Sequence, residues 1–145
     1  MSLLLRRRSL IAMALALPLT ARPVLAAPVT LKFRDLYRRG RELTPQAQAL
    51  NGQIVTMTGY MAPPLKPEIS FFVLTKLPMS TCPFCESEAQ WPDDIVLALT
   101  ETAVAPVRFT DLIRATGRFE TGFQTDPDTG FLSYIRLRDT SYRKL

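Results

Sequence analysis

The chain has 145 residues, of which 47% are hydrophobic and 21% are charged, and it contains no histidine. This composition is typical of a globular chain and excludes intrinsic disorder. Without histidine, and with only two cysteines, the chain has no Ser-His-Asp or Cys-His catalytic set and no four-ligand Cys/His zinc site within one molecule.

Residues 1–26 have the pattern of a secretory signal peptide. Arginines at positions 6–8 precede an apolar run over residues 10–19, which is too short to span a bilayer, and residues 24–27 read VLAA, a small-residue cleavage pattern. We expect cleavage after Ala26 and a periplasmic protein without a membrane span. Four of the 18 basic residues and none of the 13 acidic residues precede residue 27, so the exported chain carries a net charge of +1. That balance argues against a nucleic-acid-binding protein.

The sequence is compatible with two export routes. Arg7 and Arg8, followed by Ser9 and two apolar residues, resemble the twin-arginine signal, which implies a route that carries folded proteins. The general secretory route would instead deliver the cysteines unfolded into an oxidising compartment.

Residues 27–145 are predicted to form one β-rich domain, since this length supports a single core. Residues 27–50 form a helical or irregular lead-in. Phe33, Leu36 and Tyr37 have helical spacing, and Thr44 followed by Pro45 is typical of a helix start.

Residues 51–140 are predicted to contain five strands. β-Branched and apolar residues, separated by proline, glycine and aspartate, place these strands at residues 53–62, 69–76, 93–100, 111–122 and 130–139. The second strand is so apolar that we expect both of its faces to be covered.

Two of these strands resemble each other, because IVTMTGYM and LIRATGRF place Gly59 and Gly117 at matching positions. A glycine inside a strand usually marks a bulge or a tight bend. We therefore predict a mainly β (α+β) fold: a small five-stranded OB-like barrel with a short N-terminal helix. The alternative is an antiparallel sheet with that helix packed on one face.

Cys82 and Cys85 are separated by Pro83 and Phe84. This CPFC motif resembles the dithiol of glutaredoxins and implies, as one hypothesis, a periplasmic thiol-disulfide oxidoreductase with Cys82 as the nucleophile. A thioredoxin-type fold requires a long crossover helix after the second cysteine. The nine residues before Ile95, interrupted by Pro92, are too few for it.

Two further readings of the cysteine pair stay open. A disulfide across so short a loop would stiffen its own turn and contribute little to global stability. The pair could also bind a metal: two thiolates suffice for Cu(I), with help from the thioether of Met79 or Met61. Zinc would need additional carboxylates, for which the candidates are Glu86, Glu88 and Asp93.

Residues 50–100 resemble a family of uncharacterised exported bacterial proteins, some of which are encoded beside metal-uptake ABC transporters. The positions that carry the resemblance are Gly59, Tyr60, Pro63, Cys82 and Pro92. Family members have a histidine soon after the cysteine, where this chain has Phe84 and Cys85, which puts a shared metal site in doubt. The resemblance implies a periplasmic accessory protein with a transport protein as its partner.

Together these observations predict an exported accessory or binding protein rather than an enzyme, with a CxxC loop linked to metal handling.

Overall fold

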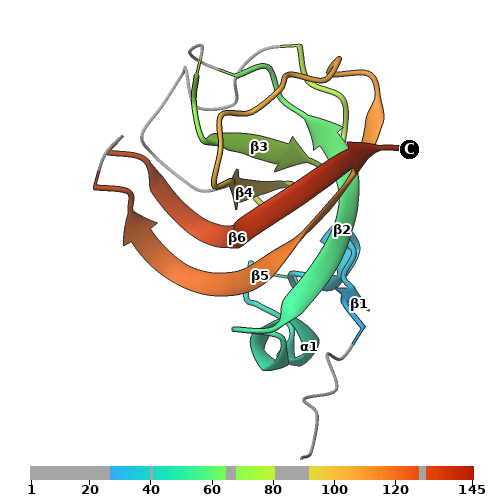
Figure 1. Cartoon of the computed structure of the whole chain (residues 1–145). Coiled ribbons are helices and arrows are strands. Elements are labelled where there is room, and N and C mark those ends of the chain that lie inside the picture. Colours follow the sequence, from blue (N-terminus) through green and yellow to red (C-terminus); the bar gives the residue numbers. More distant parts are fainter. Residues whose placement is uncertain (1–26, 40, 65–67, 81–91, 128–129) are drawn as a thin grey trace, which may run out of the picture.

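The computed structural model describes residues 27–39, 41–64, 68–80, 92–127 and 130–145. These residues form a mainly β structure with one six-stranded mixed sheet and very little helix. In Figure 1, the last two strands run side by side as a long curved hairpin across the molecule. None of the described helices is long and apolar enough to cross a membrane.

All five predicted strands are present, and a short sixth strand precedes them. The strands are β1 (Val29–Thr30), β2 (Ile54–Met61), β3 (Phe71–Thr75), β4 (Ile95–Leu99), β5 (Leu112–Thr125) and β6 (Leu132–Lys144). The last strand ends five residues later than predicted, because its C-terminal part continues to pair with the start of β5. Every residue of β3 is buried, which confirms that both of its faces are covered.

The strand order in the sheet is β1-β2-β3-β4-β6-β5, and β2 also pairs with β5. Each of the five strands from β2 to β6 therefore pairs with two others of these five, and β2 pairs with β1 as well. The alternative of a purely antiparallel sheet is wrong, because β4 pairs with β6 in parallel and β1 pairs with β2 in parallel. The parallel pairing arises because the chain leaves the end of β4, forms β5 at the other side of the sheet, and returns as β6.

Helical structure in the lead-in is confined to a 3-10 helix, η1 (Phe33–Asp35), and a single turn, α1 (Pro45–Ala49). The helical spacing of Phe33, Leu36 and Tyr37 does not produce a longer helix, because Tyr37 forms a backbone bridge with Leu43 instead. Thr44 is the N-cap of α1, as predicted, and its hydroxyl accepts a hydrogen bond from the Ala47 amide.

Gly59 and Gly117 each lie where the backbone approaches another strand closely. A Cβ atom on Gly59 would lie 2.5 Å from the Thr75 carbonyl oxygen, and one on Gly117 would lie 2.7 Å from the Arg138 carbonyl oxygen. The register of β5 and β6 shifts between Thr116 and Arg118, so Gly117 sits at a bulge. The two resembling strands pair antiparallel, with Gly59 opposite Ile113 and Gly117 opposite Val55.

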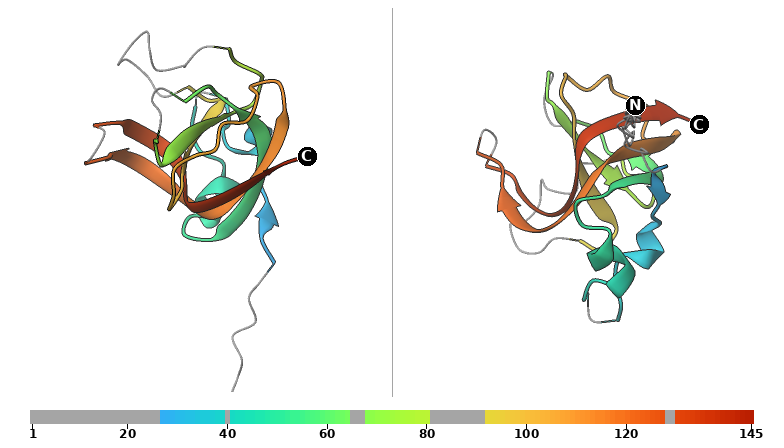
Figure 2. Two further views of the ribbon diagram at one scale, coloured as in Figure 1. Left: turned by 45° about the horizontal axis from the view of Figure 1, so that its top comes forward. Right: turned by 60° about the horizontal axis from the view of Figure 1, so that its bottom comes forward.

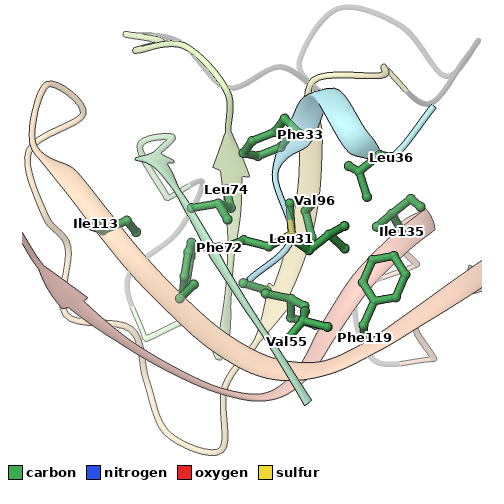
Figure 3. Packing of buried hydrophobic residues seen from close by; sticks show 14 of the residues in the cluster. Leu31, Phe33, Leu36, Val55, Phe72, Leu74, Val96, Ile113, Phe119 and Ile135 are labelled. Carbon is green, nitrogen blue, oxygen red and sulfur yellow. The ribbon is translucent and has the colours of Figure 1, made fainter. Parts of the chain in front are cut away.

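The apolar residues form two clusters on opposite faces of β3 and β4. The larger one lies inside the ring of strands and includes Phe72, Leu74, Val96 and Phe119 (Figure 3). The smaller one lies on the other face, where Phe71, Val73, Ile95 and Leu97 are covered in part by Ile69 and Phe131. The rings of Phe71 and Phe131 lie 5.4 Å apart.

Candidate functional site

Cys82 and Cys85 fall within residues 81–91, outside the described residues, as do Glu86 and Glu88. The structure does describe the two strands on either side of them, β3 and β4. β3 and β4 pair antiparallel as direct neighbours, from Phe71 opposite Leu99 to Thr75 opposite Ile95. The Lys76 amide donates to the Asp94 carbonyl at 2.9 Å, which closes the base of the connection between them.

The pairing of β3 and β4 bears on the glutaredoxin resemblance. A thioredoxin-type dithiol is followed by a crossover to a parallel strand, whereas the strand after Cys85 is antiparallel to the strand before Cys82. The expectation that the chain lacks the thioredoxin fold is therefore confirmed for the described strands.

The metal-ligand candidates that the structure describes are Met61, Met79 and Asp93, and they do not form a site together. Met61 is fully buried in the main core, and its sulfur accepts a hydrogen bond from the Val107 amide at 3.5 Å. Asp93 forms an ion pair with Arg41 at 2.7 Å. Met79 is half-buried. Among described residues, no group of three or more His, Cys, Asp or Glu side chains is arranged to hold a metal ion.

A groove lined mostly by polar residues lies at the opposite end of β3 and β4 from the connection that contains the cysteines. It consists of one cavity of about 530 Å³ between the segment after β4 and the end of β6, and an adjoining one of about 230 Å³ that reaches Ser70 and Arg138. The two cavities share Thr100, Glu101 and Asp139. We refer to them together as the β6 groove.

Hydrogen-bond acceptors dominate the larger cavity. The hydroxyls of Thr100, Thr140 and Tyr142 donate to backbone carbonyls of Thr102, Leu137 and Ala105, so they offer only lone pairs to the groove. Glu101 and Asp139 add carboxylates. Asp139 adopts a φ of 51° at the bulge opposite Gly117, and its carboxylate lies 3.8 Å from the Arg118 guanidinium. The smaller cavity contributes the guanidinium of Arg138.

Beside the groove, a buried arginine belongs to a three-residue ion-pair cluster. The side chain of Arg136 is only 7% exposed, and its Nε donates to Glu120 Oε2 at 2.9 Å. The Nε of Arg138 donates to the same oxygen at 2.7 Å. Arg136 Nη1 also donates to the Gly122 carbonyl and to the Ser133 hydroxyl. The cluster therefore ties the two strands of the β5–β6 hairpin together.

Burial alone would raise the pKa of Glu120, but hydrogen bonds from Arg138 and Arg136, together with their charges, more than offset it and leave the pKa below its ordinary value of 4.5. Glu120 is thus ionised at neutral pH. Its carboxylate keeps the buried guanidinium of Arg136 paired.

Sequence reasoning did not single out Glu120, Arg136 or Arg138. The alternation YIRLR, in which arginines occupy one face and aliphatic residues the other, was the available signal. It identifies the strand but does not reveal that Arg136 is buried, because that depends on the parallel pairing of Arg136 with Leu97.

No family model matches the chain, and no curated protein matches it. Among solved structures, the chain is similar to a DUF3299 family protein from Pseudomonas aeruginosa PAO1, at 15% sequence identity and a TM-score of 0.53. The match covers 83% of this chain and 97% of that protein's chain. At this identity the similarity shows a shared fold alone, and the DUF3299 family is itself uncharacterised.

Proposed function

We propose that the protein is an exported periplasmic accessory or binding module built on an OB-like barrel, with the cysteine loop at one end. One observation carries the proposal: the ring of pairings from β2 through β3, β4, β6 and β5 back to β2. A small Greek-key ring of five strands is the arrangement of OB-type barrels, which serve mainly as binding scaffolds. The fold shared with a DUF3299 protein is in keeping with this reading.

The covered face of β3 and β4 makes a nucleic-acid ligand a poor fit for such a module. OB-type barrels bind oligonucleotides on the face of their second and third strands, where bases stack on aromatic side chains. In this chain those strands correspond to β3 and β4, and Phe71 on that face packs against Phe131 instead. The β6 groove, whose lining residues are mostly polar and include several hydrogen-bond acceptors, is the better candidate for a small ligand.

The cysteine loop is the second part of the proposal. Because β3 and β4 are antiparallel neighbours, the pair Cys82 and Cys85 belongs to the segment that connects them, whose two ends are joined by the hydrogen bond from the Lys76 amide to the Asp94 carbonyl. We propose that the pair is a local disulfide or a metal-binding dithiol for Cu(I) or zinc, in keeping with a role beside a metal-transport partner. The alternative function is a thiol-disulfide oxidoreductase that uses the same two cysteines on this different fold.

Mass spectrometry of the protein isolated from the periplasm separates these states. A mass lower by two protons, without metal, indicates a disulfide, and a mass raised by one copper or zinc ion indicates a metal-binding dithiol. Steady turnover of small disulfide substrates that disappears in Cys82→Ser would show that the accessory-protein reading is wrong and the oxidoreductase reading right. The matched control is Ser80→Ala, which lies in the same connection and should leave every readout unchanged.

Export is tested separately. Cell fractionation and N-terminal sequencing should find a periplasmic protein that begins at Ala27. A double Arg7→Lys/Arg8→Lys variant should stop export if the twin-arginine route is used, and should leave it intact if the general secretory route is used. Retention of the unprocessed chain in the cytoplasm of wild-type cells would contradict the periplasmic assignment.

A further inference from the structure

Two arginines face each other on the outer surface of the sheet. Arg114 of β5 is directly opposite Arg143 of β6, and Thr58 of β2 is directly opposite Arg114 on its other side. Residues that are directly opposite in a ladder share a face, and like charges in this position destabilise a sheet. The buried neighbours Ile113 and Ala115 point the other way, into the core, so the two arginines point outward.

Nothing in the described part of the chain neutralises this pair. Neither guanidinium makes an ion pair or a side-chain hydrogen bond with a described residue. Arg143 is exposed and Arg114 is half-buried. A second opposed pair on the same strands, Arg118 and Arg138, behaves differently. Arg118 lies 3.8 Å from Asp139, and Arg138 binds Glu120 at 2.7 Å. Of these two opposed pairs, Arg114 and Arg143 are therefore the one without acidic partners among the described residues.

An apolar row lies beside this pair, at the end of the barrel. Two residues further along the same face, Leu112 is opposite Tyr60 on one side and bonded through its carbonyl to the Leu145 amide on the other. Leu112 is 38% exposed and Leu145 is 49% exposed. In the turn before β5, Phe109 is a further exposed apolar side chain. At this end of the barrel, Leu112 and Leu145 thus lie at the edge, and Arg114 and Arg143 lie two residues further from the edge along the same strands.

The spacing of the two rows matches the interfacial region of a bilayer. Two residues along a strand span about 7 Å, and interfacial apolar side chains are buried about 5–10 Å into the boundary between headgroups and acyl chains. Leucines that enter this boundary would bring the arginines to the depth of the phosphates. Guanidinium groups bind phosphate oxygens in a bidentate manner, and tyrosine prefers the membrane interface.

We propose that this arginine-leucine face docks the protein peripherally on an anionic membrane surface. The face is defined by Tyr60, Leu112, Arg114, Arg143 and Leu145. The neighbouring carboxylate of Asp111 is paired with Lys144 at 2.8 Å. None of these five residues lines either cavity of the β6 groove. The inference is independent of the cysteine chemistry and of the export route.

The expected strength follows from the charges. A basic side chain near an anionic surface contributes about 1 kcal/mol, so two arginines together account for roughly a 30-fold change in partition coefficient. The interaction should weaken at high ionic strength, because the Debye length falls from about 10 Å at 0.1 M salt to about 3 Å at 1 M.

Co-sedimentation with vesicles tests the proposal on the chain from Ala27 onward, which contains every described strand and core residue. The vesicles contain phosphatidylcholine with 30 mol% phosphatidylglycerol, or phosphatidylcholine alone. We expect binding to the anionic vesicles only, a loss of about 30-fold in Arg114→Gln/Arg143→Gln, and a smaller loss in Leu112→Ser. The matched control is Arg38→Gln/Arg39→Gln, which removes the same net charge from an exposed segment of the lead-in.

The result that overturns the proposal is equal binding to both vesicle types, no binding, or an equal loss in both double variants. Binding to a poly-glutamate peptide but not to anionic vesicles would likewise overturn it, in favour of an acidic protein partner. Thermal unfolding of each variant, followed by circular dichroism, verifies that folding is unaffected. Should the double variant fail to fold, the salt dependence of wild-type binding decides: partition that does not weaken between 50 mM and 500 mM NaCl contradicts the proposal.

Discussion

The β5–β6 hairpin holds two groups of opposed charges that differ in one respect. Between the bulge at Gly117 and the connection from β5 to β6, every arginine has an acidic partner. Arg118 pairs with Asp139, and Arg136 and Arg138 both pair with Glu120. On the other side, Arg114 and Arg143 face each other without an acid. The same two strands therefore carry, next to each other, a group of arginines with acidic partners, which we call the closed network, and a pair of arginines without one, which we call the open pair.

The difference separates charges that serve the fold from charges that are available to a partner. The closed network contains a buried guanidinium, which must be paired because an isolated buried charge costs several kcal/mol. The open pair is at the surface, where water screens its repulsion and the cost of keeping it is small. Both strands are visible side by side in Figure 2, where the hairpin extends beyond the rest of the sheet.

The largest expected effect comes from the residue that separates the two groups. Gly117→Ala places a Cβ 2.7 Å from the Arg138 carbonyl oxygen and 2.9 Å from the Thr140 hydroxyl, so the backbone must move. We expect the free energy of unfolding to fall by about 3 kcal/mol, the upper end for overpacking. Urea denaturation measures it. The control Gly52→Asn has open space and a positive φ that asparagine tolerates, and should be nearly neutral.

Removing the acid of the closed network should have the next largest effect. Glu120→Gln leaves the buried guanidinium of Arg136 without its counter-charge, and we expect a loss of about 2 kcal/mol, below the range for fully buried pairs because Glu120 is 26% exposed. Asp139→Asn, which affects only the exposed pair with Arg118, should cost less than about 0.5 kcal/mol. Equal losses in the two variants, measured by urea denaturation, would remove the distinction between buried and exposed pairs.

A smaller effect concerns pH. The pKa of Glu120 is lower in the folded state than its ordinary value of 4.5, so folding favours the ionised carboxylate. Its stabilising contribution is therefore complete above about pH 4.5 and is lost as the pH falls through the folded-state pKa. The stability gap between wild type and Glu120→Gln should accordingly shrink in denaturation experiments between pH 5 and pH 3. A gap that stays constant over this interval would mean that Glu120 does not titrate as described.

The smallest effect has the opposite sign. Arg143→Thr removes the repulsion with Arg114, and we expect the unfolding free energy to rise by about 0.5 kcal/mol, within the range for cross-strand pairs. Arg138→Thr, in the closed network, should instead lower it because it removes a hydrogen bond to Glu120. Precise thermal unfolding of both variants tests this contrast, and a loss of stability in Arg143→Thr would show that the open pair has a structural role.

Much of the fold could be predicted from local sequence. β-Branched alternation identified the strands, and Thr44 identified the start of α1. Gly59 and Gly117 were recognised as unusual because glycine is rare inside a strand, and both lie at close backbone approaches. These signals are local, since each depends on residues within a few positions.

The candidate sites depended on information that is not local. Arg114 and Arg143 are 29 positions apart, and their opposition follows from the bulge that shifts the register at Gly117. The burial of Arg136 follows from its parallel pairing with Leu97. The helical spacing of Phe33, Leu36 and Tyr37 did not produce a longer helix, because Tyr37 forms a backbone bridge with Leu43 instead. The proposed roles of Cys82 and Cys85 stay predictions, because both lie outside the described residues.

The most direct test of the central claim is the partition of Arg143→Glu onto vesicles with 30 mol% phosphatidylglycerol. The substitution creates an opposite-charge pair with Arg114, so it should preserve or raise stability while it removes two units of positive charge from the docking face. We predict a partition coefficient roughly 30-fold below that of the wild type, from about 1 kcal/mol for each unit of charge. A partition coefficient within twofold of the wild type, in a variant that is fully folded, would contradict the account.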